Sequence, residues 1–234
     1  MIAVTFALPA ESSDFIRRLQ DRKSSSGGIN LVAGFFYRKD VVVLHTGAGA
    51  VVARERIATF LDEHSPDLLI SAGFAGALTD ELKVGDLLLA KNFSTPALLP
   101  AAEAALSGSG VHIGTLTTAE TTLHLSHERE AVARSTGAVA VDMETAIVAE
   151  ACAASTVPML SLRVVSDSTA LPFPAPPSVL FDLQRQKTNL TKLCFYLARH
   201  PTTVGRLIAF ARRITVVRRS LADALEVLVR EARV

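Results

Sequence analysis

Residues 41–53, VVVLHTGAGAVVA, run from a short apolar segment through a glycine turn into a segment with helical patterning. Val41–Leu44 is continuous in valine and leucine, which is typical of a strand that is buried on both faces of a sheet. The glycines allow a tight passage from this strand into the next helix. The stretch therefore predicts one strand and one helix of a sheet that is covered by helices.

The same alternation recurs along most of the chain. Further apolar runs predict strands at Ile2–Phe6, Leu68–Ile70, Leu87–Leu89, Val139–Val141 and Met159–Val165. Helical patterning occupies Pro9–Leu19, Val51–His64, Ser126–Ser135 and Glu144–Ala154. This rhythm predicts an α/β fold: a single three-layer domain with a central, mostly parallel or mixed twisted sheet flanked by helices. Ser24–Gly28 is expected to form a flexible turn and Ser94–Gly110 a loop near the pocket mouth.

The 234 residues fit one domain of this kind. We assign residues 1–170 to the α/β domain and residues 171–234 to a helical C-terminal extension packed on the same domain, because LPFPAPP at 171–177 interrupts regular structure. Hydrophobic residues make up 49% of the chain and its formal net charge is +1, which argues against disorder and against a nucleic-acid partner.

Two cysteines, Cys152 and Cys194, lie in apolar contexts that favour reduced thiols. His124 and His127 are a close histidine pair without an acidic or cysteine partner at zinc spacing, so we expect no metal site and no cofactor. The first residues form an apolar strand without a basic leader, and no apolar stretch approaches the ~18 to 20 residues of a membrane span. We therefore expect a cytoplasmic protein.

The glycine turn at 47–53 is close to a dinucleotide fingerprint, G-x-G-x-x-A, with its alanine one position later. A NAD-type site also needs an acidic residue at the carboxyl end of the next strand, whereas Asp67 precedes its strand. This placement argues against a dinucleotide. Two interpretations stay open: a purely structural turn, or an anion site at the helix N-terminus formed by Gly47 and Gly49 with Arg54 nearby.

Small residues dominate the stretch SAGFAGAL at 71–78, directly after a predicted buried strand. Ala72 and Gly73 would let the backbone approach a flat ligand closely. Phe74 could stack on a base or fill the core, and its residue type does not decide between them.

Three acidic residues follow three predicted strands, at the edge where α/β sheets bind ligands. Glu11 is either a helix-dipole residue or an active carboxylate. Glu144 could accept two vicinal hydroxyls of a ribose, whereas the neighbouring Asp142 suits a helix cap. Asp167 could donate a proton. Each residue alone is equally well explained as a cap or a turn residue.

The joint occurrence of these motifs resembles the nucleoside phosphorylase and nucleosidase superfamily, which includes methylthioadenosine/S-adenosylhomocysteine nucleosidase. The resemblance covers roughly residues 1–170. It rests on ALPAE at 7–11, GAGAVVA at 47–53, SAGFAGAL at 71–78 with LKVGD at 82–86, VDMET at 141–145 and VVSD at 164–167.

This resemblance implies cleavage of the N-glycosidic bond of a purine, adenine-type nucleoside. By it, Glu11 corresponds to the carboxylate that positions or activates the nucleophile, and Asp167 to the acid that protonates the leaving purine. Substrate contacts are expected from Ala72, Gly73, Phe74, Met143, Glu144 and Ser166. The resemblance also implies a homodimer or a larger assembly, in which a neighbouring subunit can complete the pocket.

The nucleophile stays open between water and phosphate as co-substrate. Phosphorylases of the superfamily commonly place an arginine where this chain has Ser71, so the residue types favour hydrolysis. Residues 167–172, the motif YLARHP at 196–201 and an arginine-rich tail look like the hopanoid-associated phosphorylases, which act on adenosylhopane and whose name favours phosphorolysis.

That tail carries Arg199, Arg206, Arg212, Arg213, Arg218, Arg219, Arg230 and Arg233. Its arginines alternate with apolar residues, so a second hypothesis has it lie peripherally on the inner membrane face. Three further functions are weighed against these: a methylthioadenosine/S-adenosylhomocysteine nucleosidase, a NAD-dependent oxidoreductase and a non-catalytic nucleoside-binding module.

Overall fold

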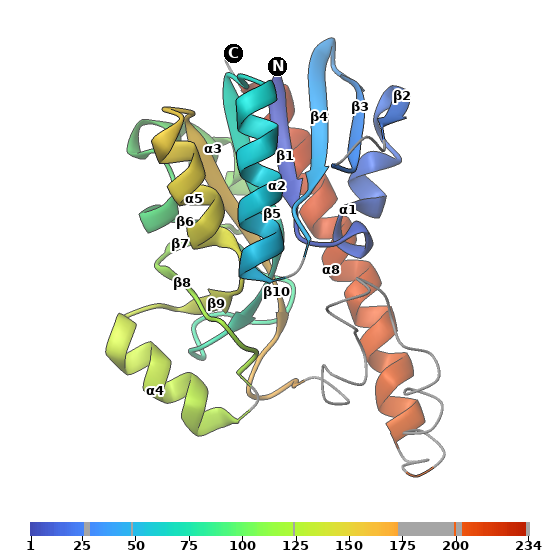
Figure 1. Ribbon diagram of the computed structural model, residues 1–234. Helices are drawn as coiled ribbons and strands as arrows, with labels where there is room; N and C mark the ends of the chain where they lie inside the picture. The colour runs from blue at the N-terminus through green and yellow to red at the C-terminus, as the bar shows by residue number, and fades with distance from the viewer. Residues whose placement is uncertain (26–28, 48, 124, 173–198, 200–202, 233–234) are drawn as a thin grey trace.

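The computed structural model describes residues 1–25, 29–47, 49–123, 125–172, 199 and 203–232. In these residues ten strands form a single mixed sheet with helices on both faces (Figure 1). The strands are β1 (Ile2–Phe6), β2 (Gln20–Ser25), β3 (Leu31–Phe36), β4 (Lys39–His45), β5 (Leu68–Ala77), β6 (Leu87–Ala90), β7 (His112–Gly114), β8 (Leu116–Thr118), β9 (Ala140–Asp142) and β10 (Met159–Asp167). The α-helices are α1 (Pro9–Ile16), α2 (Ala50–Glu63), α3 (Leu99–Leu106), α4 (Ser126–Thr136), α5 (Thr145–Ala154) and α8 (Thr203–Glu231). The α/β fold expected from the sequence is confirmed.

The centre of the sheet is parallel. Its order is β2-β3-β4-β1-β5-β10-β6-β7, and β1 pairs in parallel with both β4 and β5, as β5 does with β10. The carboxyl ends of these four strands therefore lie at one edge. Antiparallel β9 joins β5 at Gly76 and Ala77, near that same edge.

Side chains of alternate residues in β1 enter opposite cores, as the period of two in a strand requires. Ile2, Val4 and Phe6 pack in a cluster with residues of α1, α3 and α8. Ala3 packs on the other face with residues of α2 and α5. Because both faces are covered, all five residues of the strand are buried and four of them are apolar, and this is the pattern that predicts it from the sequence.

Two sequence expectations are corrected. The strand predicted at Leu68–Ile70 continues to Ala77, so residues 71–77 lie within β5 and do not form a turn after it. Residues 94–110, expected to be a loop, contain two short 3₁₀ turns and helix α3, in which Ala102 and Leu106 are buried. Alanine and leucine give this stretch a helical, core-facing side that its proline and serine content obscured. The expected turn at 24–28 falls partly outside the described residues.

Helix α8 is 29 residues long, and its second half packs on the domain. Val217, Leu221, Leu225 and Leu228 belong to the cluster that also contains residues of β1 and β10. The first half exposes apolar side chains, Val204, Ile208 and Val216. No helix in the described part of the chain combines the length and the hydropathy that a bilayer crossing requires.

Candidate active site

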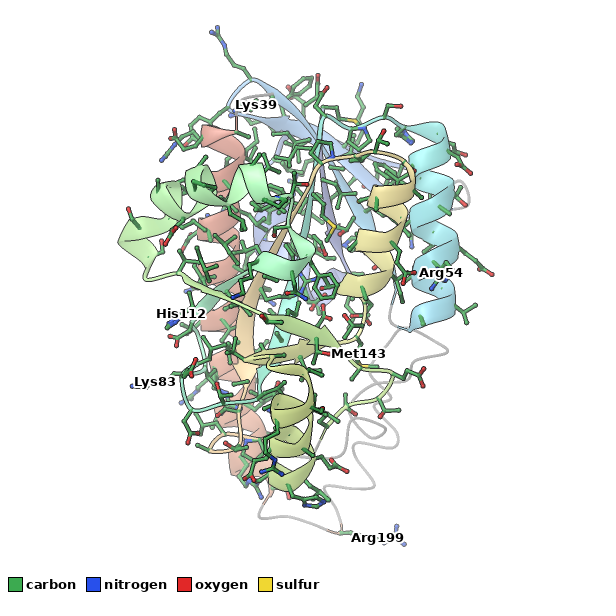
Figure 2. The ribbon with its side chains drawn as sticks, turned by 90° about the vertical axis from the view of Figure 1, so that its left-hand side faces the viewer. Lys39, Arg54, Lys83, His112, Met143 and Arg199 are labelled. Carbon is green, nitrogen blue, oxygen red and sulfur yellow. The ribbon has the colours of Figure 1, made fainter. Side chains whose placement is uncertain are left out.

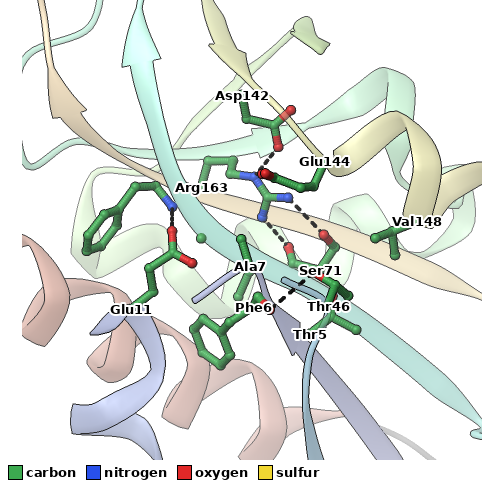
Figure 3. Close-up of a pocket in the computed structure, with 13 residues that line it drawn as sticks. Thr5, Phe6, Ala7, Glu11, Thr46, Ser71, Asp142, Glu144, Val148 and Arg163 are labelled. Atoms are coloured by element: carbon green, nitrogen blue, oxygen red, sulfur yellow. Dashed lines mark hydrogen bonds and ion pairs between the residues drawn. The ribbon is translucent and has the colours of Figure 1, made fainter. Parts of the chain in front are cut away.

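A pocket of about 260 Å³ lies beside the ends of β1 and β4, where β5 and β10 continue past them (Figure 3). It is lined by Thr5, Phe6, Ala7, Glu11, Thr46, Ser71, Ala72, Gly73, Phe74, Asp142, Glu144, Val148 and Arg163. Two of the three predicted carboxylates, Glu11 and Glu144, thus share one pocket although they are 133 positions apart in sequence. The parallel strands bring them together.

Glu11 is fixed by two backbone amides. Its Oε2 accepts the N–H of Leu8 at 2.9 Å, and its Oε1 accepts the N–H of Phe74 at 3.0 Å. The first bond caps α1 and the second ties the helix to β5, so one carboxylate sets the helix against the sheet. A Cβ at Gly73 would lie 3.3 Å from Oε1 of Glu11, so a side chain at position 73 would crowd this carboxylate. Burial raises the pKa of Glu11, although the two amide hydrogen bonds act in the opposite direction.

Arg163, which is absent from the site residues predicted above, lies at the centre of the pocket (Figure 3). Its Nε donates to Asp142 at 3.0 Å and its Nη1 to the carbonyls of Ser71 and Leu162 at 2.8 and 2.9 Å. Its Nη2 donates to the hydroxyls of Ser71, at 2.8 Å, and Thr145. These bonds use all five N–H groups of the guanidinium. An arginine inside the most apolar strand was the available signal, because a buried cation needs a counter-charge.

Glu144 stands at the N-terminus of α5, beside Arg163. Its Oε1 accepts the N–H of Gly49 at 3.4 Å. Burial, together with the negative charges of Asp142 and Glu11, raises the pKa of Glu144 to about 8. Asp142 itself accepts the Thr145 N–H at 3.2 Å, which agrees with its predicted role as a helix cap.

Asp167, the third predicted carboxylate, does not line the pocket. It is buried at the end of β10 and forms an ion pair with Arg129 of α4. Ser166 Oγ donates to its other oxygen at 2.8 Å. Arg129 carries no signal in the sequence, because most residues of α4 are polar and exposed and nothing marks this arginine among them.

The remaining predicted residues divide into two groups. Ala72, Gly73 and Phe74 line the pocket, whereas Met143, at the junction of β9 and α5, and Ser166 do not (Figure 2). Arg54 points outward on α2 and pairs with Glu150 at 3.0 Å, where both side chains are 62% exposed.

The glycine turn faces the pocket with both of its described amides already engaged. Gly47 N–H donates to the Ala7 carbonyl at 3.0 Å, and Gly49 N–H donates to Glu144. Asp67 forms an ion pair with the amino group of Met1 and precedes β5, at the opposite edge of the sheet from the pocket. This position supports the argument against a dinucleotide site.

A family model described as the phosphorylase superfamily matches residues 1–95 and 92–199. A 5'-methylthioadenosine/S-adenosylhomocysteine nucleosidase of Shewanella halifaxensis (strain HAW-EB4) is 32% identical over 89 residues, which are 38% of this chain and 39% of that protein. The matched segment thus spans about two fifths of the length of that relative.

Solved structures resemble the whole fold. The nucleosidase of the same name from Neisseria meningitidis, in complex with methylthio-immucillin-A, superimposes with a TM-score of 0.75 at 20% identity and covers 99% of each chain. The futalosine hydrolase of Helicobacter pylori strain 26695 gives a TM-score of 0.74 at 18% identity, over 99% of this chain and 97% of that one. At these identities the likeness concerns the fold.

Proposed function

The chain belongs to the phosphorylase superfamily, and on that premise we propose that it cleaves the N-glycosidic bond of a purine nucleoside. One observation carries the proposal: Glu11 and Glu144 face a single pocket around Arg163. Two carboxyl groups on opposite sides of a small hollow suit a ribosyl group, because one can hold its hydroxyls while the other orients the attacking group.

In this proposal, different residues act on the sugar and on the base of the nucleoside. Glu144 binds the 2' and 3' hydroxyls, with Met143 beside it, and Glu11 orients the nucleophile. Asp167, supported by Ser166, protonates the purine as the glycosidic bond breaks. Phe74 lines the side on which the base lies. The similarity to methylthioadenosine/S-adenosylhomocysteine nucleosidases favours an adenine nucleoside with a 5' thio substituent.

We propose water as the nucleophile. Of the described residues that line the pocket, Arg163 alone is cationic, and all five of its N–H groups are engaged. A phosphate would meet carboxyl groups of Glu11, Asp142 and Glu144 without a free donor from that guanidinium. Arg54, the candidate cation for an anion site, pairs on the surface instead. Water needs no such cation, because a carboxylate can accept its proton.

A product assay tests this proposal. Methylthioadenosine, adenosine, inosine and a 5'-alkyl adenosine are incubated with the protein in the presence and in the absence of phosphate. We expect free base and the free pentose in both conditions. A ribose 1-phosphate that forms only with phosphate would contradict hydrolysis, and no released base from any of the nucleosides would contradict the whole assignment.

A second proposal concerns the substrate's 5' group and the location of the protein. We propose that it is a cytoplasmic enzyme for a lipid-linked nucleoside, such as adenosylhopane, that approaches the inner membrane face through α8. The exposed Val204, Ile208 and Val216 in the first half of that helix, with Arg206 and Arg212, support the idea. The motif at 196–201 that suggested it lies mainly outside the described residues.

Liposome co-sedimentation tests the membrane contact. We expect binding to vesicles with anionic lipid and release by salt, because the arginines would contact charged headgroups. Vesicles that retain no protein at low salt would contradict it. The expected homodimer or larger assembly stays a prediction, which analytical ultracentrifugation can test.

A further inference from the structure

Both carboxylate oxygens of Asp167 accept hydrogen bonds from side chains. Arg129 pairs with Oδ2 and Ser166 Oγ donates to Oδ1 at 2.8 Å. The side chains of Arg129 and Asp167 are only 4% and 3% exposed. In the ion pair, Asp167 is an ionised carboxylate. To protonate the purine, as proposed above, Asp167 must carry a proton, so its state in this structure is not the catalytic one.

The ion pair lies farther along the same strands than the sugar pocket. In the register of β5 and β10, Arg163 is opposite Gly73 and Asp167 is opposite Gly76. Three residues of strand correspond to about 10 Å, the scale of one nucleoside. A nucleoside whose sugar meets Glu11 and Glu144 would therefore extend its base towards Asp167.

The guanidinium of Arg129 lies beside Asp167 and donates several further hydrogen bonds. Its Nη1 donates to the Ala77 carbonyl at 2.9 Å, and its Nε and Nη2 donate to the Leu123 carbonyl at 3.2 and 3.1 Å. A Cβ at Gly76 would lie 3.1 Å from Asp167 Oδ2 and 3.2 Å from Arg129 Nη1, so the backbone makes room for the pair. Only Arg129 is buried among the residues of α4, all of which the structure describes. The contact that holds Asp167 thus attaches α4 to the sheet, together with the packing of Val132 and Ala133 on a small apolar cluster.

We propose that Arg129 is a positioning residue that holds Asp167 away from the pocket, and that the base of the substrate displaces its guanidinium. The proposal rests on the function proposed above. After displacement the carboxylate takes up a solvent proton, which hydronium or a buffer acid supplies. When the glycosidic bond breaks, its electron pair goes to the base, and the Asp167 proton follows it. The resulting Asp167 carboxylate can pair with Arg129 again. The ion pair therefore re-forms after the base has left.

Two substrates separate this role from a structural one. A purine nucleoside needs a proton on its leaving group, whereas 4-nitrophenyl β-riboside releases a stable phenolate and needs none. In Arg129→Gln we expect the ratio of kcat/KM for adenosine to kcat/KM for the riboside to rise about tenfold, a fraction of the ~10² to 10⁴ that acid catalysis supplies. Arg129→Lys keeps the cation and should keep the wild-type ratio. Arg134→Gln, an exposed arginine of the same helix, is the matched control.

A ratio that is unchanged or lower in a folded Arg129→Gln variant would overturn the proposal. An equal loss on both substrates gives an unchanged ratio and indicates a merely structural arginine. If wild-type protein cleaves neither substrate, the function itself fails, and the inference fails with it.

Wild-type protein supplies a second measurement if Arg129→Gln does not fold. Hydrogen–deuterium exchange is followed with and without adenine. We expect slower exchange in β5 and faster exchange in α4, because displacement of Arg129 removes the buried ion pair that helps to hold that helix. Protection of β5 with unchanged or slower exchange in α4 would overturn the role of Arg129. Absence of protection in both segments would count against the proposed base site and therefore against both proposals.

Discussion

The Nε of Arg163 donates to Oδ2 of Asp142 at 3.0 Å, and both side chains are almost fully buried. This pair lies beneath the pocket, with Glu11 and Glu144 nearby. One cation therefore faces three acidic side chains. Burial is the main reason why the pKa values of Glu11 and Glu144 are raised above the usual range, and the negative charge of Asp142 adds to both shifts.

Loss of the Arg163 guanidinium should destabilise the fold strongly. We expect Arg163→Met to lower the free energy of unfolding by about 3 to 5 kcal/mol, because Asp142 would keep a buried charge without a partner. Arg54→Met removes an exposed ion pair and should change stability by less than about 1 kcal/mol. Urea unfolding of both variants measures the difference. Similar losses in the two variants would contradict the buried role of Arg163.

Glu11→Gln should destabilise the protein although it keeps the shape of the side chain. Each carboxylate oxygen now accepts one backbone N–H, from Leu8 and from Phe74. Glutamine has one accepting oxygen, so its NH₂ group would face one of the two amides. An unsatisfied buried donor costs about 1 to 3 kcal/mol, and turnover should also fall because the nucleophile loses its base. Glu150→Gln on the surface is the control for unfolding, and equal midpoints in urea would refute the prediction.

Stability should fall as the pH rises, through Glu144. Its pKa is about 8 in the folded protein, against a usual value of 4.5. Between these values the folded protein holds a proton that the unfolded chain releases. The contribution of Glu144 to the free energy of unfolding is therefore fully present below about pH 4.5 and is lost as the pH rises through 8. The raised pKa of Glu11 changes the free energy of unfolding in the same direction.

Thermal unfolding at pH 5, 7 and 9 measures this dependence. Glu144→Gln cannot ionise, so we expect its Tm to exceed that of the wild type at pH 9, with a smaller difference at pH 5. The reverse order, or the same difference at every pH, would mean that Glu144 is not the titrating group.

Six of the ten strands in the described residues, and the meeting of Glu11 and Glu144 in one pocket, could be predicted because both depend on local signals. Continuous apolar runs identify strands that are buried on both faces, and parallel pairing then places Glu11 and Glu144 at one edge. The end of β5 was missed because its Ser71–Ala77 segment is rich in small residues, which resemble a turn when strand pairing is unknown. Pairing with β9 and β10 is what makes this segment a strand.

The two arginines of the site depend on contacts that no local pattern contains. Arg163 becomes a site residue because Asp142, 21 positions away, lies across from it. Arg129 lies on a helix that is mostly polar and exposed, and only the register of β10 brings Asp167 to it. The placement of the acidic residues after strands therefore predicts that Glu11 and Glu144 meet, whereas the charge partners of the acidic residues follow from the tertiary structure.

Asp167→Asn tests the acid on the base side. Asparagine keeps the shape of the side chain but has no proton to give, so we expect kcat for adenosine to fall by ~10² to 10⁴. KM should change little, because the sugar contacts of Glu11 and Glu144 remain. Turnover of 4-nitrophenyl β-riboside should be nearly unaffected, since its leaving group needs no proton.

The same substitution removes the partner of a buried guanidinium, so a loss of folded protein could imitate a loss of catalysis. Activity is therefore measured at a temperature where circular dichroism shows the variant to be folded, and Asp86→Asn, at a turn outside the pocket, is the matched control. A fall on adenosine alone assigns the acid to Asp167, because damage to the sugar site would slow both substrates. Near-normal adenosine turnover in the folded variant would show that another group protonates the base.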